Sequence, residues 1–333
     1  MDDALKVRQM LAGNWLTQAL YVVAKLRVPD ALHAAPKTAD ELAAVVLAHP
    51  RALYRLLRSL TGSGIFLEDE QHRFSLTPMG ECLRSDVPGS QWARAVIGGD
   101  MFYAAWGELL GAVKTGEPAF NKSFGEPLFD FLSKRPDTAR LFDDTMVGVH
   151  GRETAAIVEA LDCSAMRVVA DVGGGKGGMI AALLAKHAHL RGMHFDLPGV
   201  AERAAAAADP AVASRCDFVG GSFFDSVPAG ADAYLLRHVI HDWSEERSTL
   251  ILRNIGRVMG DDARIYVIED VVPPNNGPSV AKMLDVAMLV LTGGEERTER
   301  EYEALYAAAG LELTRVIPTS AGVSLIEGRR SRG

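Results

Sequence analysis

Cysteine is scarce, since the chain of 333 residues contains only three. Cys82, Cys163 and Cys216 lie far apart and show no spacing typical of a disulfide framework or a metal site. Small secreted scaffolds depend on paired cysteines, whereas single thiols stay reduced in the cytoplasm. We therefore expect three free thiols in a cytoplasmic protein that binds no metal.

Long apolar runs and an excess of positive charge are also absent. No stretch reaches the roughly 18–20 apolar residues of a membrane helix, and the acidic opening over residues 1–4 is unlike a signal peptide. The formal net charge is −8, whereas binding to phosphate backbones requires a basic surface. Apolar residues make up 48% and charged residues 23%, as in ordinary globular domains. We expect neither a membrane nor a nucleic acid as partner.

The first 100 residues show the pattern of a winged helix. Apolar residues recur at helical spacing, and the sequence Thr38-Ala39-Asp40-Glu41 has the form of a capping box. Two short apolar runs on either side of residues 68–73 indicate a hairpin. The expected elements are helices over 14–26, 42–47 and 51–60 and hairpin strands over 65–67 and 74–76.

A winged helix raises the alternative of a DNA-binding regulator. Residues 1–100 contain 11 Lys and Arg and 11 Asp and Glu, so this segment has no net charge. A neutral module attracts phosphate weakly, and binding that weakens with salt would mark a true DNA-binding domain. We favour a dimerisation role for residues 1–100.

The remaining chain predicts a helical connector and then an α/β domain. Residues 101–162 are helical in pattern and rich in aromatic rings, which either form a local core or line an aromatic pocket. From residue 163 short apolar strands alternate with helices, which indicates a mostly parallel, Rossmann-like sheet of seven strands. The expected strands are 167–172, 193–196, 216–219, 233–237, 263–268, 311–317 and 323–327. The expected helices are 178–186, 201–208, 244–259, 280–291 and 298–309.

A glycine-rich turn follows the first of these strands. Residues 171–178 read Asp-Val-Gly-Gly-Gly-Lys-Gly-Gly, and Gly173, Gly175 and Gly178 match the dinucleotide pattern G-x-G-x-x-G. Asp196 ends the next strand, where a carboxylate can accept both hydroxyls of a ribose. The same features suit NAD and S-adenosylmethionine, and a tight turn beside a solvated aspartate is a third interpretation.

Downstream motifs separate these alternatives. Phe-Asp-Leu-Pro over residues 195–198, His-Asp-Trp over 241–243 and Gly-Gly-Glu-Glu-Arg-Thr over 293–298 follow the glycine turn in that order. Together they resemble the class I S-adenosylmethionine-dependent O-methyltransferases of the plant caffeate and hydroxyindole type and their bacterial polyketide-tailoring relatives. The resemblance covers nearly the whole chain. It implies methylation of a hydroxyl on a small aromatic metabolite, an S-adenosylhomocysteine product, no metal, and an intertwined homodimer.

The resemblance also implies a set of cofactor-binding residues. They are Gly173 and Gly175 beside the methionine portion, Asp196 at the ribose, Ser222 and Phe223 at the adenine, and Arg237 near the cofactor. The chain departs from the family pattern at two of these positions, since Ser222 replaces an aspartate and Arg237 a lysine. Lys176 stands where a small Ser or Thr is common, and we expect its side chain to point to solvent.

His241 matches the catalytic base of the family, and Glu269 and Glu296 match the acids that flank it. An unperturbed histidine, with a pKa of about 6.5, is mostly neutral at pH 7 and can accept a phenolic proton. Taken alone, Glu296 beside Arg297 is more typical of a surface ion pair. We expect Asp242 to cap the helix that begins at Ser244.

The acceptor pocket is the least defined part of the prediction. Its candidates are Phe102, Trp106, Met146 and Met288, with His150 as a weaker one; each also suits ordinary core packing. Two alternatives to the phenolic acceptor stay open: a ring nitrogen or non-methyl chemistry on the same fold, and an NAD-dependent dehydrogenase.

Overall fold

The computed structural model describes residues 2–331, with the backbone alone over residues 149–152. The chain forms two compact units, one from Met1–Gly107 and Phe129–Val149 and the other from Glu108–Leu128 and His150–Gly333. The predicted borders at residues 100 and 162 stay a prediction. The candidate side chain of His150 lies outside the described residues.

The first unit contains the winged helix that the sequence predicts. Its helix, helix and hairpin pack around a core of buried aliphatic and aromatic side chains, and a short added strand completes a three-stranded antiparallel sheet in the order β1-β3-β2. The capping box of Thr38 and Glu41 forms as expected. The winged-helix elements are α3 (Val28–Leu32), β1 (Lys37–Thr38), α4 (Ala39–Val46), α5 (Pro50–Thr61), β2 (Phe66–Glu68) and β3 (Arg73–Leu76).

Helices before and after the winged helix complete the first unit. They are α1 (Asp3–Leu11), α2 (Gly13–Lys25), α6 (Pro78–Glu81), α7 (Trp92–Gly99), α8 (Met101–Trp106) and α11 (Leu128–Ser133). The long helix α12 (Pro136–Ala160) begins in the first unit and ends in the second. The predicted helix over 14–26 is therefore confirmed as α2, and the predicted helical character of the connector is confirmed as well.

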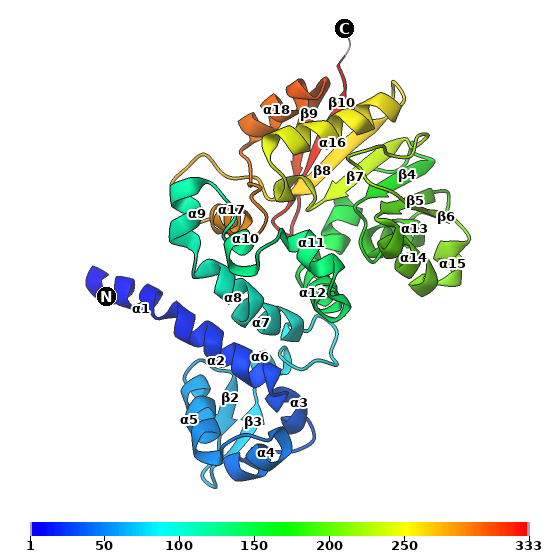
Figure 1. Cartoon of the computed structure of the whole chain (residues 1–333). Helices are drawn as coiled ribbons and strands as arrows, with labels where there is room; N and C mark the ends of the chain where they lie inside the picture. Colours follow the sequence, from blue (N-terminus) through cyan, green and yellow to red (C-terminus); the bar gives the residue numbers. More distant parts are fainter. Residues whose placement is uncertain (1, 332–333) are drawn as a thin grey trace. The chain divides into compact units, whose positions relative to one another are not determined.

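The second unit is built on a seven-stranded sheet in the order β6-β5-β4-β7-β8-β10-β9 (Figure 1). Within it, β10 is antiparallel to both of its neighbours, and the pairs among the other strands are parallel. The strands are β4 (Val168–Val172), β5 (Arg191–Asp196), β6 (Cys216–Gly220), β7 (Ala233–Arg237), β8 (Arg264–Glu269), β9 (Leu311–Pro318) and β10 (Ser324–Arg330).

Helices cover both faces of this sheet, namely α13 (Gly178–Lys186), α14 (Pro198–Ala207), α15 (Pro210–Ala213), α16 (Glu245–Val258) and α18 (Glu299–Ala308). Three further helices of this unit, α9 (Leu109–Thr115), α10 (Ala119–Phe124) and α17 (Val280–Leu291), pack on one another. All seven predicted strands and all five predicted helices of this domain are present, with ends that differ by a few residues. No helix in the described chain has the length and apolar character to cross a bilayer.

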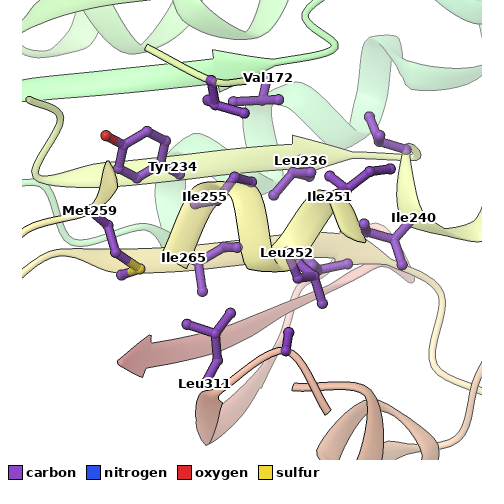
Figure 2. Close-up of a cluster of buried hydrophobic side chains, with 14 of the residues drawn as sticks. Val172, Tyr234, Leu236, Ile240, Ile251, Leu252, Ile255, Met259, Ile265 and Leu311 are labelled. Carbon is purple, nitrogen blue, oxygen red and sulfur yellow. The ribbon is translucent and has the colours of Figure 1, made fainter. Parts of the chain in front are cut away.

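The period of two along each strand divides the core into two layers. Tyr234 and Leu236 of β7 join one cluster of buried side chains, whereas Leu235 between them joins the other. Figure 2 shows Ile251, Leu252 and Ile255 of α16 packed against the strands in the first cluster. Successive side chains of a strand point to opposite faces, so the helices on both faces fix the sheet and the positions of its strand ends.

Candidate functional site

The candidate site residues of the second unit gather at one edge of the sheet. The glycine turn follows β4, Asp196 ends β5, Ser222 and Phe223 follow β6, and Arg237 ends β7. Parallel strands bring their carboxyl ends to a common edge, which is where α/β sheets bind ligands. The predicted cofactor residues are therefore brought together.

The glycine turn makes a tight backbone bend that side chains would obstruct. Gly173 and Gly175 have φ values of 74° and 55°, in the left-handed region that favours glycine. A Cβ on Gly173 would lie 2.7 Å from Cγ2 of Val239. The N–H of Gly173 donates to the carbonyl of Phe195 at 2.8 Å, which ties the turn to β5. Lys176 is exposed on this turn, as expected.

Asp196 joins the turn to the end of β5. Its Oδ2 accepts a hydrogen bond from the N–H of Gly175 at 2.8 Å, and its Oδ1 accepts one from the N–H of Leu197 at 2.7 Å. The carboxylate is half-buried. Each of its oxygens has a second acceptor position, so Asp196 can still accept the hydroxyls of a ribose.

Charged groups beneath the turn are buried. Asp171 is 2% exposed, and its Oδ2 has no hydrogen-bond partner among the described residues. Burial raises the pKa of Asp171, although the positive charge of Arg237 opposes this rise. Arg237 donates to Oγ1 of Thr154 at 2.8 Å. A cation and an incompletely paired carboxyl thus lie close to the bare backbone of the turn.

The residues after β6 form a small aromatic cluster. The rings of Phe223 and Phe224 lie 4.8 Å apart, and Trp243 lies 4.8 Å from Phe224. Oγ of Ser222 accepts a hydrogen bond from the N–H of Phe224 at 3.2 Å. Ser222 therefore stabilises its own loop, and the flat apolar surface at this end of the site comes from Phe223.

His241 lies on a short 3-10 helix, η1 (Ile240–Asp242), that follows β7. The loop that precedes α18 packs directly on its backbone. A Cβ on Gly294 would lie 1.9 Å from the carbonyl oxygen of His241, and the N–H of Glu295 donates to that oxygen at 2.9 Å. Only a glycine lets the two backbones come this close, so Gly294 fixes the loop against η1.

Both predicted acids contact His241, but at different atoms. Nδ1 of His241 lies 2.5 Å from Oε1 of Glu296, and the backbone N–H of His241 donates to Oε1 of Glu269 at 3.0 Å. Glu296 therefore orients the ring, and Glu269 holds the backbone. With Nδ1 engaged, Nε2 is the nitrogen that can exchange a proton with an acceptor.

The protonation of His241 differs from the expectation. Burial lowers the pKa of His241, but the hydrogen bond to Glu296 and the surrounding carboxylates raise it to about 10. The expectation of a ring that is neutral at pH 7 used the unperturbed pKa, whereas the carboxylates of Glu296, Asp242 and Glu269 favour the cation. Burial also raises the pKa of Glu296. We place the shared proton on the imidazole, since the other nearby carboxylates stabilise a cation there.

The expected helix cap and one alternative interpretation of Glu296 differ from the structure. Ser244, not Asp242, caps α16, with its side chain accepting from the N–H of Arg247. Oδ1 of Asp242 instead lies 4.0 Å from Nε2 of His241, and burial raises the pKa of Asp242 to about 6. The alternative of a surface ion pair between Glu296 and Arg297 does not form, because Arg297 is buried and pairs with Glu295 at 2.9 Å.

The acceptor candidates fall in different units. Met288 is 7% exposed on α17 of the second unit, together with His241. Phe102, Trp106 and Met146 are half-buried in the first unit. Their roles in substrate binding stay a prediction.

Several polar groups near His241 could not be predicted from the sequence. Tyr302 donates to Glu269, and Oδ1 of Asp285 accepts from the N–H of Glu296 at 3.1 Å. His238, whose φ of 52° is unusual for a non-glycine residue, lies 3.0 Å from Glu153 through Nε2. These residues belong to no recognisable motif, and only the fold brings them together.

Comparison with known proteins identifies the family. Residues 106–312 match the family model of the O-methyltransferase domain, and residues 9–86 match that of the O-methyltransferase dimerisation domain. The chain belongs to the O-methyltransferase family. The resemblance inferred from the four motifs is therefore confirmed. The chain is an S-adenosylmethionine-dependent O-methyltransferase, and the interpretation as an NAD-dependent dehydrogenase is excluded.

Relatives of this O-methyltransferase are similar over almost the whole chain. The phenazine O-methyltransferase of Lysobacter antibioticus is 42% identical over 322 residues, covering 96% of this chain and 94% of the relative. The crystal structure of LaPhzM has a TM-score of 0.96 at 40% identity, covering 99% of this chain and 100% of LaPhzM.

Two other relatives bear on ligand and acceptor. An O-methyltransferase from neocarzinostatin biosynthesis, solved with S-adenosylmethionine and 2-hydroxy-5-methyl naphthoic acid, has a TM-score of 0.85 at 34% identity and covers 95% of this chain and 96% of its own. An 8-amino-8-demethylriboflavin N,N-dimethyltransferase of Streptomyces davaonensis is 35% identical, covering 94% of this chain and 92% of its own. The family thus includes both oxygen and nitrogen methylation.

Proposed function

We propose that this chain transfers the methyl group of S-adenosylmethionine to a phenolic hydroxyl of a small aromatic metabolite, with His241 as the general base. The observation that carries the proposal is the 2.5 Å contact between Nδ1 of His241 and Glu296, at the same sheet edge as the glycine turn. That contact leaves Nε2 to take the phenolic proton.

The residues at the turn fit the proposed cofactor. Asp196 is a half-buried carboxylate at the end of β5 and has acceptor positions left for ribose hydroxyls. The unpartnered Oδ2 of Asp171 suits a positively charged donor beside the turn. Phe223 supplies an apolar surface for an adenine. When bound there, the cofactor would supply an electrophilic methyl group on a sulfonium.

The chain's own residues would then manage one proton. The acceptor oxygen bonds to the methyl carbon while the carbon–sulfur bond breaks and its electron pair stays on sulfur. The phenolic proton ends on Nε2 of His241 in those molecules whose ring has given up its own proton, a fraction that grows as the pH rises toward about 10. A phenol has a pKa of about 10, which matches the pKa of about 10 of His241. Matched pKa values let the proton be shared at little cost, and Glu296 stabilises the resulting cation.

An oxygen acceptor is favoured over nitrogen for a physical reason. An aromatic amine attacks through its lone pair and requires no base before the transfer, whereas His241 and its acids form a proton-accepting group. Three carboxylates around one imidazole serve no purpose for an acceptor that is already nucleophilic. The relative that methylates nitrogen keeps that alternative testable.

The decisive experiment compares His241→Ala with the unchanged chain. We expect S-adenosylhomocysteine to bind equally well by calorimetry, because the turn and Asp196 are intact. Turnover of a phenolic acceptor should fall about 100- to 10,000-fold, the range for losing a general base. His72→Ala, at an exposed histidine of the other unit, is the control. Undiminished turnover in His241→Ala would contradict the role of His241 and favour a nitrogen acceptor.

We also propose that the chain acts as a homodimer through helices α1 and α2 at the start of its dimerisation domain. The helices α1 and α2 expose several large apolar side chains, and α1 buries none of its residues within the chain. Exposed apolar surface of this kind marks an interaction site. The exposed residues are Val7, Met10, Leu11, Trp15 and Leu16.

A further inference from the structure

A fully buried tyrosine lies behind the candidate base. Tyr302 is 0% exposed in the first half of α18, whose start is fixed by a capping box between Thr298 and Glu301. Its hydroxyl donates to Oε2 of Glu269 at 2.5 Å. No part of the proposed function assigns a role to this side chain.

The tyrosine is connected to the base through one carboxylate. Oε2 of Glu269 accepts from Tyr302, and Oε1 accepts from the backbone N–H of His241 at 3.0 Å. Glu269 is itself 0% exposed. A carboxylate held by two donors in a buried place has a fixed orientation, and charge-assisted hydrogen bonds of this kind are among the strong ones.

The tyrosine and the second acid belong to one segment. Glu296 and Tyr302 are six positions apart. Arg297, between them, forms a parallel β-bridge with Val271, which lies just after the end of β8. Glu296 contacts the ring of His241, and Tyr302 reaches the backbone of His241 through Glu269. One segment therefore constrains both the ring and the main chain of the base.

We propose that Tyr302 is a positioning residue for methyl transfer: its hydroxyl holds Glu269 and, through Glu269, the turn that aims His241 at the acceptor. The inference rests on the proposed role of His241 as the base. The pKa of Tyr302 is raised well above its usual value by burial and by the nearby acids, so the hydroxyl remains a neutral donor at working pH.

The chain provides a matched control on the same helix. Tyr306 is also 0% exposed, but its hydroxyl donates to the backbone carbonyl of Ile326 on β10 at 2.7 Å. Replacing either tyrosine by Phe removes one buried hydroxyl and leaves one acceptor unpaired. Both variants should therefore lose stability, Tyr302→Phe more than Tyr306→Phe because its acceptor is a buried carboxylate rather than a strand carbonyl, and only Tyr302→Phe should affect the base.

The experiment measures both variants against the unchanged chain with a phenolic acceptor. For Tyr302→Phe we expect kcat to fall about 10- to 100-fold, because a small displacement of a catalytic group lowers the rate by factors of this size. The KM for S-adenosylmethionine and the Kd for S-adenosylhomocysteine should stay the same. For Tyr306→Phe we expect kcat within about two-fold of the unchanged chain. The melting temperatures of the two variants report the structural loss of each.

The pH profile separates positioning from mere support of the fold. The titratable groups that face His241 are Glu296 from the loop before α18, Asp242 from η1, Glu269 from β8 and His238 from the end of β7. Glu269 is one of the charges that raise the pKa of His241. Without the Tyr302 hydroxyl, the negative charge of Glu269 loses a donor that partly neutralises it and acts more strongly on the ring, so the alkaline rise in kcat should move to higher pH. Tyr306→Phe should leave that rise in place.

A double variant completes the test. Glu269→Gln keeps the size of the side chain and alters the acceptor of the Tyr302 hydroxyl. If the tyrosine acts through Glu269, adding Tyr302→Phe to Glu269→Gln should cause little further loss of kcat, because the two effects share one path. Additive losses, or equal kcat in the two Phe variants, would overturn the inference. Full turnover in His241→Ala would overturn the proposed function instead.

Discussion

The protonation of His241 results from two opposing effects. Burial favours the neutral ring, and hydrogen bonding to Glu296 within a group of carboxylates favours the cation. The second effect is larger, so the pKa is raised to about 10. The free site therefore holds its proton at pH 7. Two states of the complex hold the same number of protons: a neutral phenol beside a neutral ring, and a phenolate beside a cationic ring. An acceptor that binds as phenolate to the cationic ring therefore reaches the same transition state.

The change Glu296→Gln should shift the pH dependence of turnover. Because the folded-state pKa of His241 is raised, the proton-accepting form of the ring increases as the pH rises toward about 10. Removing the Glu296 charge lowers that pKa, so we expect the alkaline rise in kcat to move about 1–3 units to lower pH. The maximal kcat should fall, since the cation that forms is less well stabilised.

The acceptor itself provides the control for this measurement. A phenol titrates in the same range, but its pKa is unchanged between the two enzymes when the same compound is used. Any difference between the two profiles therefore belongs to the protein. Superimposable profiles would contradict the assignment of Glu296 as the acid that governs the ring.

Single residues could be predicted where a motif names them. His241, Glu269 and Glu296 were located by sequence, and the structure brings all three together. The contacts between them could not be predicted, because the distinction between a ring contact and a backbone contact depends on burial and on the path of a loop. The same reason explains the wrong expectation for Asp242, since both Asp and Ser suit a helix cap and only the local backbone decides.

Among the elements, the loop that precedes α18 is in tight backbone contact with η1. Gly294→Ala would place a methyl group 1.9 Å from the carbonyl oxygen of His241. Because that neighbour is backbone, it cannot turn aside, and either the loop or η1 must move. We expect a loss of about 1–3 kcal/mol of stability, typical of overpacking, together with a large fall in kcat. Chemical denaturation and a turnover assay measure the two effects.

Gly260→Ala is the matched control for the element contact. A Cβ on Gly260 meets nothing within 4 Å, and its backbone does not have a positive φ. Stability and kcat should both stay close to those of the unchanged chain. A Gly294→Ala variant as active as Gly260→Ala would show that the loop can retreat without disturbing the base.

The elements of the second unit were predictable because their hydrophobic periods are clear. Short apolar runs indicated all seven strands, and apolar residues at helical spacing indicated the helices between them. Strand ends were less exact: β5 begins at Arg191 and β10 extends to Arg330. Paired backbone sets these ends, and a sequence does not reveal which partner strand is long enough to continue the pairing. The 3-10 turn at His241 was missed for a similar reason, because it is too short to show a period.

At the scale of the whole molecule, the proposed dimer depends on an apolar surface that the single chain leaves uncovered. Met10 and Trp15 are 78% and 74% exposed. Replacing Leu11 and Trp15 by Glu should convert a species of twice the chain mass into one of the chain mass, because charges oppose burial in an interface. Light scattering after size-exclusion chromatography measures this directly.

Val45→Glu tests whether any exposed apolar residue has that effect. Val45 is 61% exposed on α4 and lies outside α1 and α2. The Val45→Glu chain should keep the mass of the unchanged protein. A single-chain mass for the unchanged protein at micromolar concentration would contradict the dimer. The sequence favoured a dimerisation role for residues 1–100 from the neutral charge of the winged helix, and residues 9–86 match the family model of the dimerisation domain; the exposure of each apolar side chain depends on the fold.

The topology also constrains how the chain can be made. β10 follows every other strand in the sequence, yet it lies between β8 and β9 inside the sheet. Until β10 has emerged from the ribosome, β8 has an unpaired edge, and the strand that holds Glu269 can recruit a wrong partner. Nascent chains therefore carry this open edge from the synthesis of β8 (Arg264–Glu269) until that of β10 (Ser324–Arg330), and a premature stop before Ser324 would leave an opened sheet for chaperones and proteases to handle.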